Sequence, residues 1–225
     1  MTINRTYPSY VAVVLAGGAA RRMETQAHHG LKTLLPLAGK PILEHICTNL
    51  QQAILPPEDI ALNIVADQSR FVPDMPIALD ASDERQGPLA GISSGLNWAA
   101  KNHPKVEWML SVSGDTPFLP LDLAEKLFDA VIKHQALIAC ALSNQRHHPT
   151  IALWSSSLQK PLENALTQGI RKIDRFSDQY NSVSMEWSCD SFDPFLNVNR
   201  PEDFQQAEEI FFVETFGWRV ILSLS

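Results

Sequence analysis

One segment, residues 13–23 with the sequence VVLAGGAARRM, constrains the fold most, because it joins an apolar strand to a glycine turn that carries two arginines. The apolar, β-branched run over residues 11–15 is typical of a parallel strand that is buried on both faces. Gly17 and Gly18 lack side chains, so main-chain N–H groups can approach a polyphosphate, and Arg22 can donate charge-assisted hydrogen bonds to it. The pattern therefore predicts a phosphate-binding turn after the first strand.

Neither of the two standard nucleotide-binding fingerprints fits this chain. The G-x-G-x-x-G pattern fails at Ala19. The G-x-x-x-x-G-K-[ST] pattern fails around Gly39 and Lys40, because Leu34 stands where its first glycine is required. Taken alone, the turn leaves a second interpretation open, in which the glycine pair only reverses the chain and the arginines are solvated.

Length, composition and charge narrow the class of protein. The chain has 225 residues, of which 45% are hydrophobic, so it can build the core of one α/β domain. It has no apolar stretch long enough for a membrane span, and residues 1–10 lack the features of a secretory signal, so we expect a cytoplasmic protein with no membrane partner. The net charge of −7 disfavours nucleic acid as a partner. Three widely spaced cysteines fit neither a disulfide framework nor a zinc site: Cys47, Cys140 and Cys189.

Apolar runs that suit buried strands alternate with segments of helical period, and this alternation is typical of right-handed βαβ units. We therefore expect a three-layer α/β/α fold with a mostly parallel, Rossmann-like sheet, forming a single domain over residues 1–225. The predicted strands are residues 11–15, 60–65, 77–79, 106–112, 137–142, 151–154 and 183–187. The predicted helices are residues 42–50, 88–99, 121–134, 158–166, 171–179 and 201–211.

Acidic residues follow several of the predicted strands, where an open parallel sheet binds its ligands. Asp67 follows the second strand, Asp80 the third, and Asp115 the strand over residues 106–112. Asp115 is the strongest candidate, because a carboxylate directly after a buried strand suits Mg²⁺, which takes few oxygens from a protein. An N-cap or Asx turn before Pro117 is the alternative. Gly87 and Gly91, near a predicted helix start, allow either close approach of a nucleotide or tight helix packing.

Six motifs occur in one order along the chain: LAGGAARRM, GKPILEH, QGPLAGISSGL, SGDTPFLP, RHHPTIALW and FLNVNRPEDF. Over residues 10–209 this series resembles the molybdenum cofactor guanylyltransferases, within the wider nucleotidyltransferases that share the LAGGxxxRM opening. Six motifs in order are far more specific than one. The resemblance implies a sheet of the nucleotide-diphospho-sugar transferase type and the transfer of GMP from GTP to the terminal phosphate of molybdopterin. Besides these two small molecules, proteins that insert molybdenum or mature molybdoenzymes are candidate partners.

The resemblance also assigns roles to residues. It makes Asp115 the ligand of Mg²⁺ and, with Arg22 and Lys32, one of three catalytic residues. Residues 10–120 form the expected nucleotide-binding part, in which either Asp67 or Asn63 contacts the guanine or the ribose. The full set of expected nucleotide contacts is Leu15, Ala16, Gly17, Gly18, Lys32, Asp67, Asp80, Gly87 and Asp115.

Residues 140–210 are expected to bind the acceptor. Arginine matches phosphate bidentately, and asparagine can both donate to and accept from a pterin edge. Side chains two apart in an extended FLNVN segment face the same side, whereas the adjacent His147 and His148 point to opposite sides, so we expect hydrogen-bonding or surface roles for the histidines instead of a metal site. The expected acceptor contacts are Arg146, Arg171, Asn197 and Asn199.

The chain departs from the family pattern RMGG-x-DK after Met23, because Glu24 and Thr25 replace the glycines and Leu31 stands in place of the acidic residue. Lys32 is nine positions after the methionine instead of five, and we predict that it still folds back onto the triphosphate. Two alternatives stay open: a cytidylyltransferase or sugar-phosphate nucleotidyltransferase of the same fold, and a catalytically weak carrier that binds the nucleotide or the cofactor.

The last 15 residues, 211–225, form an apolar tail beyond the final motif. A large apolar side chain contributes about 1.5 to 3 kcal/mol when it is buried, so this much apolar surface should be covered. We predict that the tail adds an edge element to the sheet or packs against another subunit, and that it supplies no catalytic residue.

Overall fold

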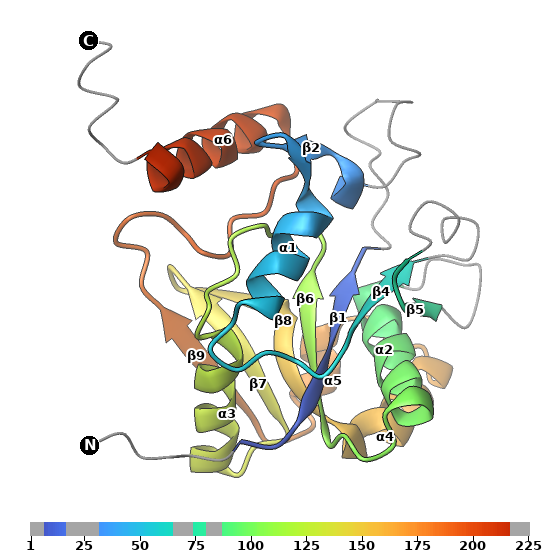
Figure 1. Ribbon diagram of the computed structural model, residues 1–225. Coiled ribbons are helices and arrows are strands. Elements are labelled where there is room, and N and C mark those ends of the chain that lie inside the picture. The colour runs from blue at the N-terminus through green and yellow to red at the C-terminus, as the bar shows by residue number, and fades with distance from the viewer. Residues whose placement is uncertain (1–6, 17–31, 65–73, 80–86, 217–225) are drawn as a thin grey trace.

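The computed structural model describes residues 7–16, 32–64, 74–79 and 87–216. At its centre is a seven-stranded sheet in the order β5-β4-β1-β6-β8-β7-β9 (Figure 1). The strands of this sheet are β1 (Tyr10–Leu15), β4 (Ile60–Ile64), β5 (Ile77–Leu79), β6 (Trp108–Ser113), β7 (Ile138–Ser143), β8 (Arg146–Ser155) and β9 (Ser182–Trp187). A small antiparallel pair, β2 (Pro36–Leu37) and β3 (Lys40–Pro41), stands apart from it.

The sheet is mostly parallel, as the alternation of strands and helices predicts. β4, β1 and β6 pair in parallel, β5 continues this direction, and β9 is parallel to β7. Only β8 runs against its neighbours, pairing antiparallel with both β6 and β7. The carboxyl ends of the parallel strands therefore lie along one edge, where ligands of such sheets bind.

Helices cover both faces of the sheet and form three layers (Figure 1). α1, α3 and α6 pack on one face, and α2, α4 and α5 pack on the other. The helices are α1 (Ile42–Gln51), α2 (Pro88–Asn102), α3 (Leu123–His134), α4 (Gln159–Thr167), α5 (Ile173–Ser177) and α6 (Pro201–Phe216), with short 3-10 turns η2 (Lys32–Leu34) and η4 (Ser156–Leu158).

The central strand β1 explains why the apolar run near the N-terminus has no polar alternation. Ala12 and Val14 belong to the core under α1 and α3, whereas Val11 and Val13 belong to the core under α2 and α4. All four side chains are fully buried. A strand that is covered on both faces needs apolar residues at every position, which is the pattern of the sequence.

All the predicted helices and strands are present, but some boundaries differ. The helix predicted over residues 171–179 is only the short α5, and the strand predicted over residues 151–154 is the longer β8. β8 begins at Arg146 and forms a hairpin with β7, so the RHHP segment is part of the sheet instead of a separate loop. The FLNVN segment, residues 195–199, was expected to be strand-like and is not part of any strand.

The C-terminal helix α6 extends to Phe216, beyond the predicted end at residue 211. The expected sheet-edge element is therefore wrong for residues 211–216, which are helical. Phe211 packs within the chain, with its ring 4.8 Å from that of Phe118 and 4.4 Å from that of His45. Residues 217–225, which carry the rest of the predicted tail, lie outside the described residues. Among the described helices, none is both long and apolar enough to cross a lipid bilayer.

Candidate active site

The carboxyl ends of three neighbouring strands are tied together by main-chain hydrogen bonds. The amide of Ala16, directly after β1, donates to the carbonyl of Asn63 at 3.0 Å, and the amide of Gly114, directly after β6, donates to the carbonyl of Leu15 at 2.9 Å. Leu15 and Ala16 therefore lie at the edge where the sequence places the nucleotide. The turn that carries Asp115 starts from the same edge.

Asp115 is held by its own turn and faces a cation. Its Oδ1 accepts a hydrogen bond from the hydroxyl of Ser113 at 2.6 Å, and its Oδ2 lies 3.5 Å from Nζ of Lys32. The side chains of Asp115 and Lys32 are 21% and 14% exposed, so this pair is partly withdrawn from water. The structure thus brings together two of the three expected catalytic residues.

Both expected acceptor asparagines reach the same place. Nζ of Lys32 also donates to Oδ1 of Asn199. The hydroxyl of Thr116 donates to Oδ1 of Asn197 at 2.8 Å, and the amide of the buried Val198 between them donates to the carbonyl of Asp115 at 2.8 Å. The turn of Asp115 and the segment of the asparagines therefore form one cluster of charged and polar groups, although 80 residues lie between Thr116 and Asn197 in the sequence. The ammonium of Lys32 contacts both Asp115 and Asn199 in this cluster.

A close approach of backbone to side chain shapes the floor of this cluster. A Cβ atom at Gly114 would lie 2.6 Å from Cγ2 of Thr33 and 2.9 Å from the carbonyl oxygen of Leu15, so only glycine fits there without movement. Thr33 is 1% exposed, and within the described part of the chain its hydroxyl has no hydrogen-bond partner. The hydroxyl oxygen of Thr33 is therefore a buried polar atom without a described partner, in the residue that follows Lys32.

The donor set around Asp115 suits Mg²⁺. The available groups are oxygens, namely the carboxylate itself and the neighbouring hydroxyl of Ser113, and the carboxylate already faces the ammonium of Lys32. Among the described residues, no three His, Cys, Asp or Glu side chains are grouped to hold a metal. One carboxylate fits an ion that completes its shell with water and nucleotide phosphates.

The other expected site residues lie elsewhere or outside the described residues. Arg146 is exposed at the β7–β8 hairpin. Arg171 is exposed, and its guanidinium donates to the carbonyls of Leu166 at 2.5 Å and Ile170 at 3.1 Å. Gly87 precedes α2 with a φ of 86°, in the region that favours glycine. Outside the described residues lie Gly17, Gly18, Arg22, Asp67 and Asp80.

Asn63, the alternative to Asp67 for contact with the guanine or the ribose, is engaged in the sheet. It is 3% exposed, and its Nδ2 donates to the carbonyl of Ala78 at 2.8 Å, so its side chain braces β4 against β5. Gly91 of α2 lies so close that an added Cβ would be 2.5 Å from Oδ1 of Asn63. Gly91 of the QGPLAGISSG motif therefore serves tight packing, whereas this contact does not decide between the two interpretations of Gly87.

A buried polar network outside this cluster was not predicted from the sequence. Nε2 of His148 lies 2.7 Å from Oγ of Ser143, which donates to Oδ1 of Asp193 at 2.8 Å. His148 is 5% exposed, and burial lowers its pKa while the carboxylate of Asp193 opposes this shift. His147 is exposed and contacts Ser184 in a groove beside α5, whereas His148 contacts Ser143 and Phe195, so the adjacent histidines face opposite sides as predicted. The only signal for this role was the alternation in RHHP.

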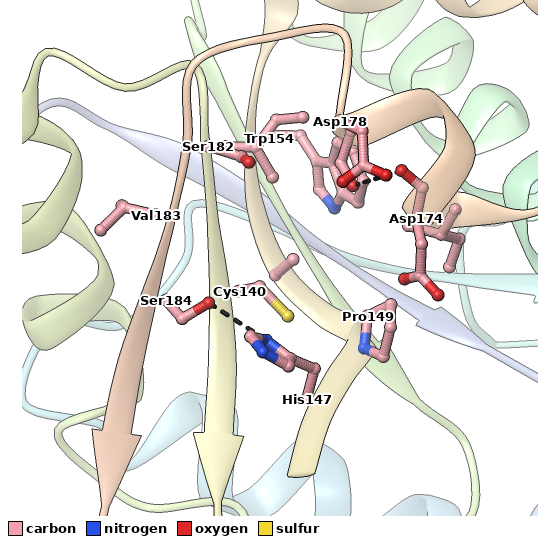
Figure 2. Close-up of a pocket in the computed structure, with 13 residues that line it drawn as sticks. Cys140, His147, Pro149, Trp154, Asp174, Asp178, Ser182, Val183 and Ser184 are labelled. Atoms are coloured by element: carbon pink, nitrogen blue, oxygen red, sulfur yellow. Dashed lines mark hydrogen bonds between the residues drawn. The ribbon is translucent and has the colours of Figure 1, made fainter. Parts of the chain in front are cut away.

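A separate groove of about 430 Å³ lies between α5 and the strands β7, β8 and β9 (Figure 2). Asp174 of α5 and Asp178, directly after α5, line it on the helix side, and on the sheet side Nδ1 of His147 lies 3.1 Å from Oγ of Ser184. Cys140 also lines it, and burial raises the pKa of this thiol to about 12, which keeps it protonated. With two carboxylates and no lysine or arginine among its described lining residues, the groove does not suit a phosphate group.

Solved structures share this sheet and its covering helices. The molybdopterin-guanine dinucleotide biosynthesis protein A from Archaeoglobus fulgidus superposes with a TM-score of 0.68 at 24% identity, covering 90% of this chain and 98% of its own. The 4-diphosphocytidyl-2C-methyl-D-erythritol synthase from Anaerococcus prevotii gives a TM-score of 0.66 at 16% identity, covering 91% and 96%. At these identities the likeness defines the fold, which is the nucleotidyltransferase sheet of the nucleotide-diphospho-sugar transferase type.

The sequence places the chain within this class. Residues 12–183 match the MobA-like NTP transferase domain, and the chain belongs to this family of nucleotidyltransferases. A molybdenum cofactor guanylyltransferase from Rhodopseudomonas palustris is 44% identical over 91% of this chain and 95% of its own length. A molybdenum cofactor guanylyltransferase from Pasteurella multocida is 36% identical over 88% and 98%. The family expected from the six motifs is therefore confirmed.

Proposed function

We propose that this protein transfers GMP from GTP to the terminal phosphate of molybdopterin and releases pyrophosphate. The observation that carries the proposal is the position of Lys32, whose ammonium contacts both Asp115 and Asn199. One of these is the expected metal ligand on the donor side, and the other is an expected acceptor contact. In this proposal the ammonium of Lys32 is the group that both reacting phosphates meet. We place the reaction in the cytoplasm, where GTP is available.

For this reaction the protein needs mainly to align the two substrates and to neutralise the charge of their phosphates. The acceptor phosphate is already a nucleophile, so no serine or histidine needs to be activated. Lys32 neutralises charge on the α-phosphate of GTP and on the departing pyrophosphate, and the amides of Gly17 and Gly18 and the guanidinium of Arg22 assist it. Mg²⁺, when bound at Asp115, supplies Lewis-acid stabilisation of the phosphate oxygens.

The acceptor side is proposed to consist of Asn197, Asn199, Arg146 and Arg171. Asn197 and Asn199 lie next to Asp115 and offer donors and acceptors to the acceptor molecule. Arg171 donates to two carbonyls, and its guanidinium has five N–H groups in all, so some remain for a phosphate oxygen. We assign Asp80 and Asp67 to the nucleotide on the family pattern alone.

A direct test is incubation of the protein with Mg²⁺, molybdopterin and one nucleoside triphosphate, with release of pyrophosphate as the readout. Release with GTP and not with CTP is the expected result, and Asp115→Asn serves as the inactive control. Release with CTP alone would identify a cytidylyltransferase. Tight binding of GTP with no release above the Asp115→Asn background would identify a carrier.

A further inference from the structure

The segment over residues 193–203, named here the asparagine strap, carries both acceptor asparagines across the turn of Asp115. Each of its ends is fixed by a carboxylate that belongs to the strap itself, Asp193 at one end and Asp203 at the other. Neither aspartate contacts Lys32 or Asp115 in a described hydrogen bond or ion pair, so their effect on the site can only be indirect.

At the C-terminal end of the strap, the carboxylate of Asp203 binds two main-chain amides. Its Oδ2 accepts hydrogen bonds from the amides of Asn199 and Arg200, both at 2.8 Å. Asp203 lies in the first turn of α6, so its carboxylate also faces the N-terminus of that helix, as the acidic member of a capping box does. The backbone of Asn199 is thereby fixed to a sixteen-residue helix.

At the N-terminal end, Asp193 ties the strap to the sheet. Its Oδ1 accepts from the hydroxyl of Ser143 at 2.8 Å and from the amide of Phe195 at 2.9 Å. Because Ser143 gives its one hydroxyl hydrogen to Asp193, the 2.7 Å contact with His148 requires that Nε2 of the histidine carries a hydrogen and donates it to Ser143. Ser143 is fully buried, so this end of the strap is fixed to β7 and β8.

Between Asp193 and Asp203, successive residues of the asparagine strap form hydrogen bonds with the site. Asn197 accepts from Thr116, Val198 donates to the carbonyl of Asp115, and Asn199 accepts from Lys32. A hydrogen bond of Lys32 to Asn199 directs the ammonium only if the asparagine is itself held in place. The backbone bond from Asn199 to Asp203 is what holds it.

We propose that Asp203, with Asp193 at the other end, is a positioning residue: it fixes Asn199 so that Asn199 directs the ammonium of Lys32 toward Asp115. The acceptor side of the site thereby sets the position of the cation that serves the donor phosphates. The geometric part of this proposal stands on the hydrogen bonds above, and only the consequence for GTP rests on the proposed function.

The test compares Asp203→Ala with Glu202→Gln, in the protein without substrates. Glu202 is the other acidic residue of the first turn of α6 and is exposed, so its neutralisation weakens the same helix end without touching the strap. Modification of Lys32 by an amine reagent is followed by mass spectrometry relative to the exposed Lys40. We expect Asp203→Ala to raise the relative reactivity of Lys32 about two- to tenfold, the change that corresponds to loss of one hydrogen bond. Glu202→Gln should leave the ratio unchanged.

A purely structural role for Asp203 predicts a different result, in which Asp203→Ala lowers the melting temperature and leaves the reactivity ratio of Lys32 at the wild-type value. That result would overturn the proposal. If Asp203→Ala does not fold, Asp203→Leu replaces it, because leucine has a similar shape and accepts no hydrogen bond, and an unchanged ratio there overturns the proposal equally.

Steady-state kinetics supply the second readout. Asp203→Ala should raise KM for GTP and lower kcat together, because a misdirected Lys32 stabilises neither the bound GTP nor the transition state. Loss of acceptor affinity alone, with GTP kinetics unchanged, would contradict the coupling. If wild-type protein releases no pyrophosphate but Asp203→Ala still exposes Lys32, the proposed function fails while the positioning role of Asp203 stands.

Discussion

The polar groups expected to act on the substrates fall into two regions that are held differently. Lys32, Asp115 and Asn199 come from three distant segments, and each contacts another member of the group or the main chain beside it. Arg146 and Arg171 are exposed, and the described side-chain bonds of Arg171 go to carbonyls of its own neighbourhood. The first region is organised before a ligand arrives, and the second can adapt to one. Substitutions in the first region should therefore lower kcat, whether or not they also change KM, and substitutions in the second should change affinity with kcat nearly constant.

The largest effect is expected from Asp115→Asn. The substitution removes charge with little change of shape, and loss of one preorganised electrostatic group costs about 10²- to 10³-fold in rate. Pyrophosphate release at saturating Mg²⁺ and GTP measures it, with melting temperature as a check on folding. Asp190→Asn, an exposed acid outside the cluster, is the matched control and should retain full activity. Near-normal turnover of Asp115→Asn would remove the metal role and with it the contrast between the two regions.

Lys32→Met should have the next largest effect. A hydrogen bond to a charged group contributes about 1.5 to 3 kcal/mol, so we expect a loss of about ten- to a hundredfold in kcat/KM for GTP. Both a higher KM and a lower kcat should contribute, because the ammonium serves substrate and transition state. Lys40→Met removes an exposed lysine that pairs with Glu44 and should leave the kinetics unchanged. If kcat/KM for GTP is unchanged in Lys32→Met, phosphate neutralisation depends on Arg21 or Arg22 instead.

Within the first region, the sequence predicted the place of Asp115 in the fold more directly than that of the asparagines, for a physical reason. Asp115 directly follows a buried strand, and the carboxyl ends of parallel strands share one edge, so its place in the fold follows from the pattern alone. The asparagines were found through a motif, although the expected strand is absent at residues 195–199. Both asparagines nevertheless contact the same cluster, with the buried Val198 between them, although these residues pair with no strand.

What could not be predicted depends on pairings between distant segments. Asp193 meets Ser143 and His148 only because β8 folds back on β7 and its register shifts between Cys140 and Ala141. Such an irregularity re-aims the side chains beyond it, and nothing in RHHP states where it falls. The packing of Thr33 against Gly114 is also invisible in the sequence, since it arises where two separate turns meet.

Arg171→Met tests the adaptable region. One exposed arginine that meets the acceptor phosphate should affect acceptor affinity by about two- to tenfold, with kcat nearly constant, as expected for an interaction that is equal in the ground and transition states. The measurement is KM for molybdopterin at saturating GTP, with Arg175→Met on the exposed side of α5 as control. A fall in kcat as large as that of Lys32→Met would show that Arg171 belongs with the organised cluster instead.

The smallest effect is expected from Thr33→Val, at the one buried side-chain polar atom of the described residues that has no partner. A methyl group replaces the hydroxyl with almost no change of shape, so Cγ2 keeps its packing against Gly114. Removing an unsatisfied buried hydroxyl relieves a desolvation cost of about 1 to 3 kcal/mol, and the free energy of unfolding should rise by an amount at the lower end of this range. Turnover should stay within about twofold of wild type, since no transition-state hydrogen bond is lost. Thr33→Ser, which keeps the hydroxyl and removes the packed methyl, should instead lower stability by about 1 kcal/mol. If Thr33→Val loses activity while its stability rises, the hydroxyl acquires a partner when substrates bind, and the organised cluster then extends to Thr33.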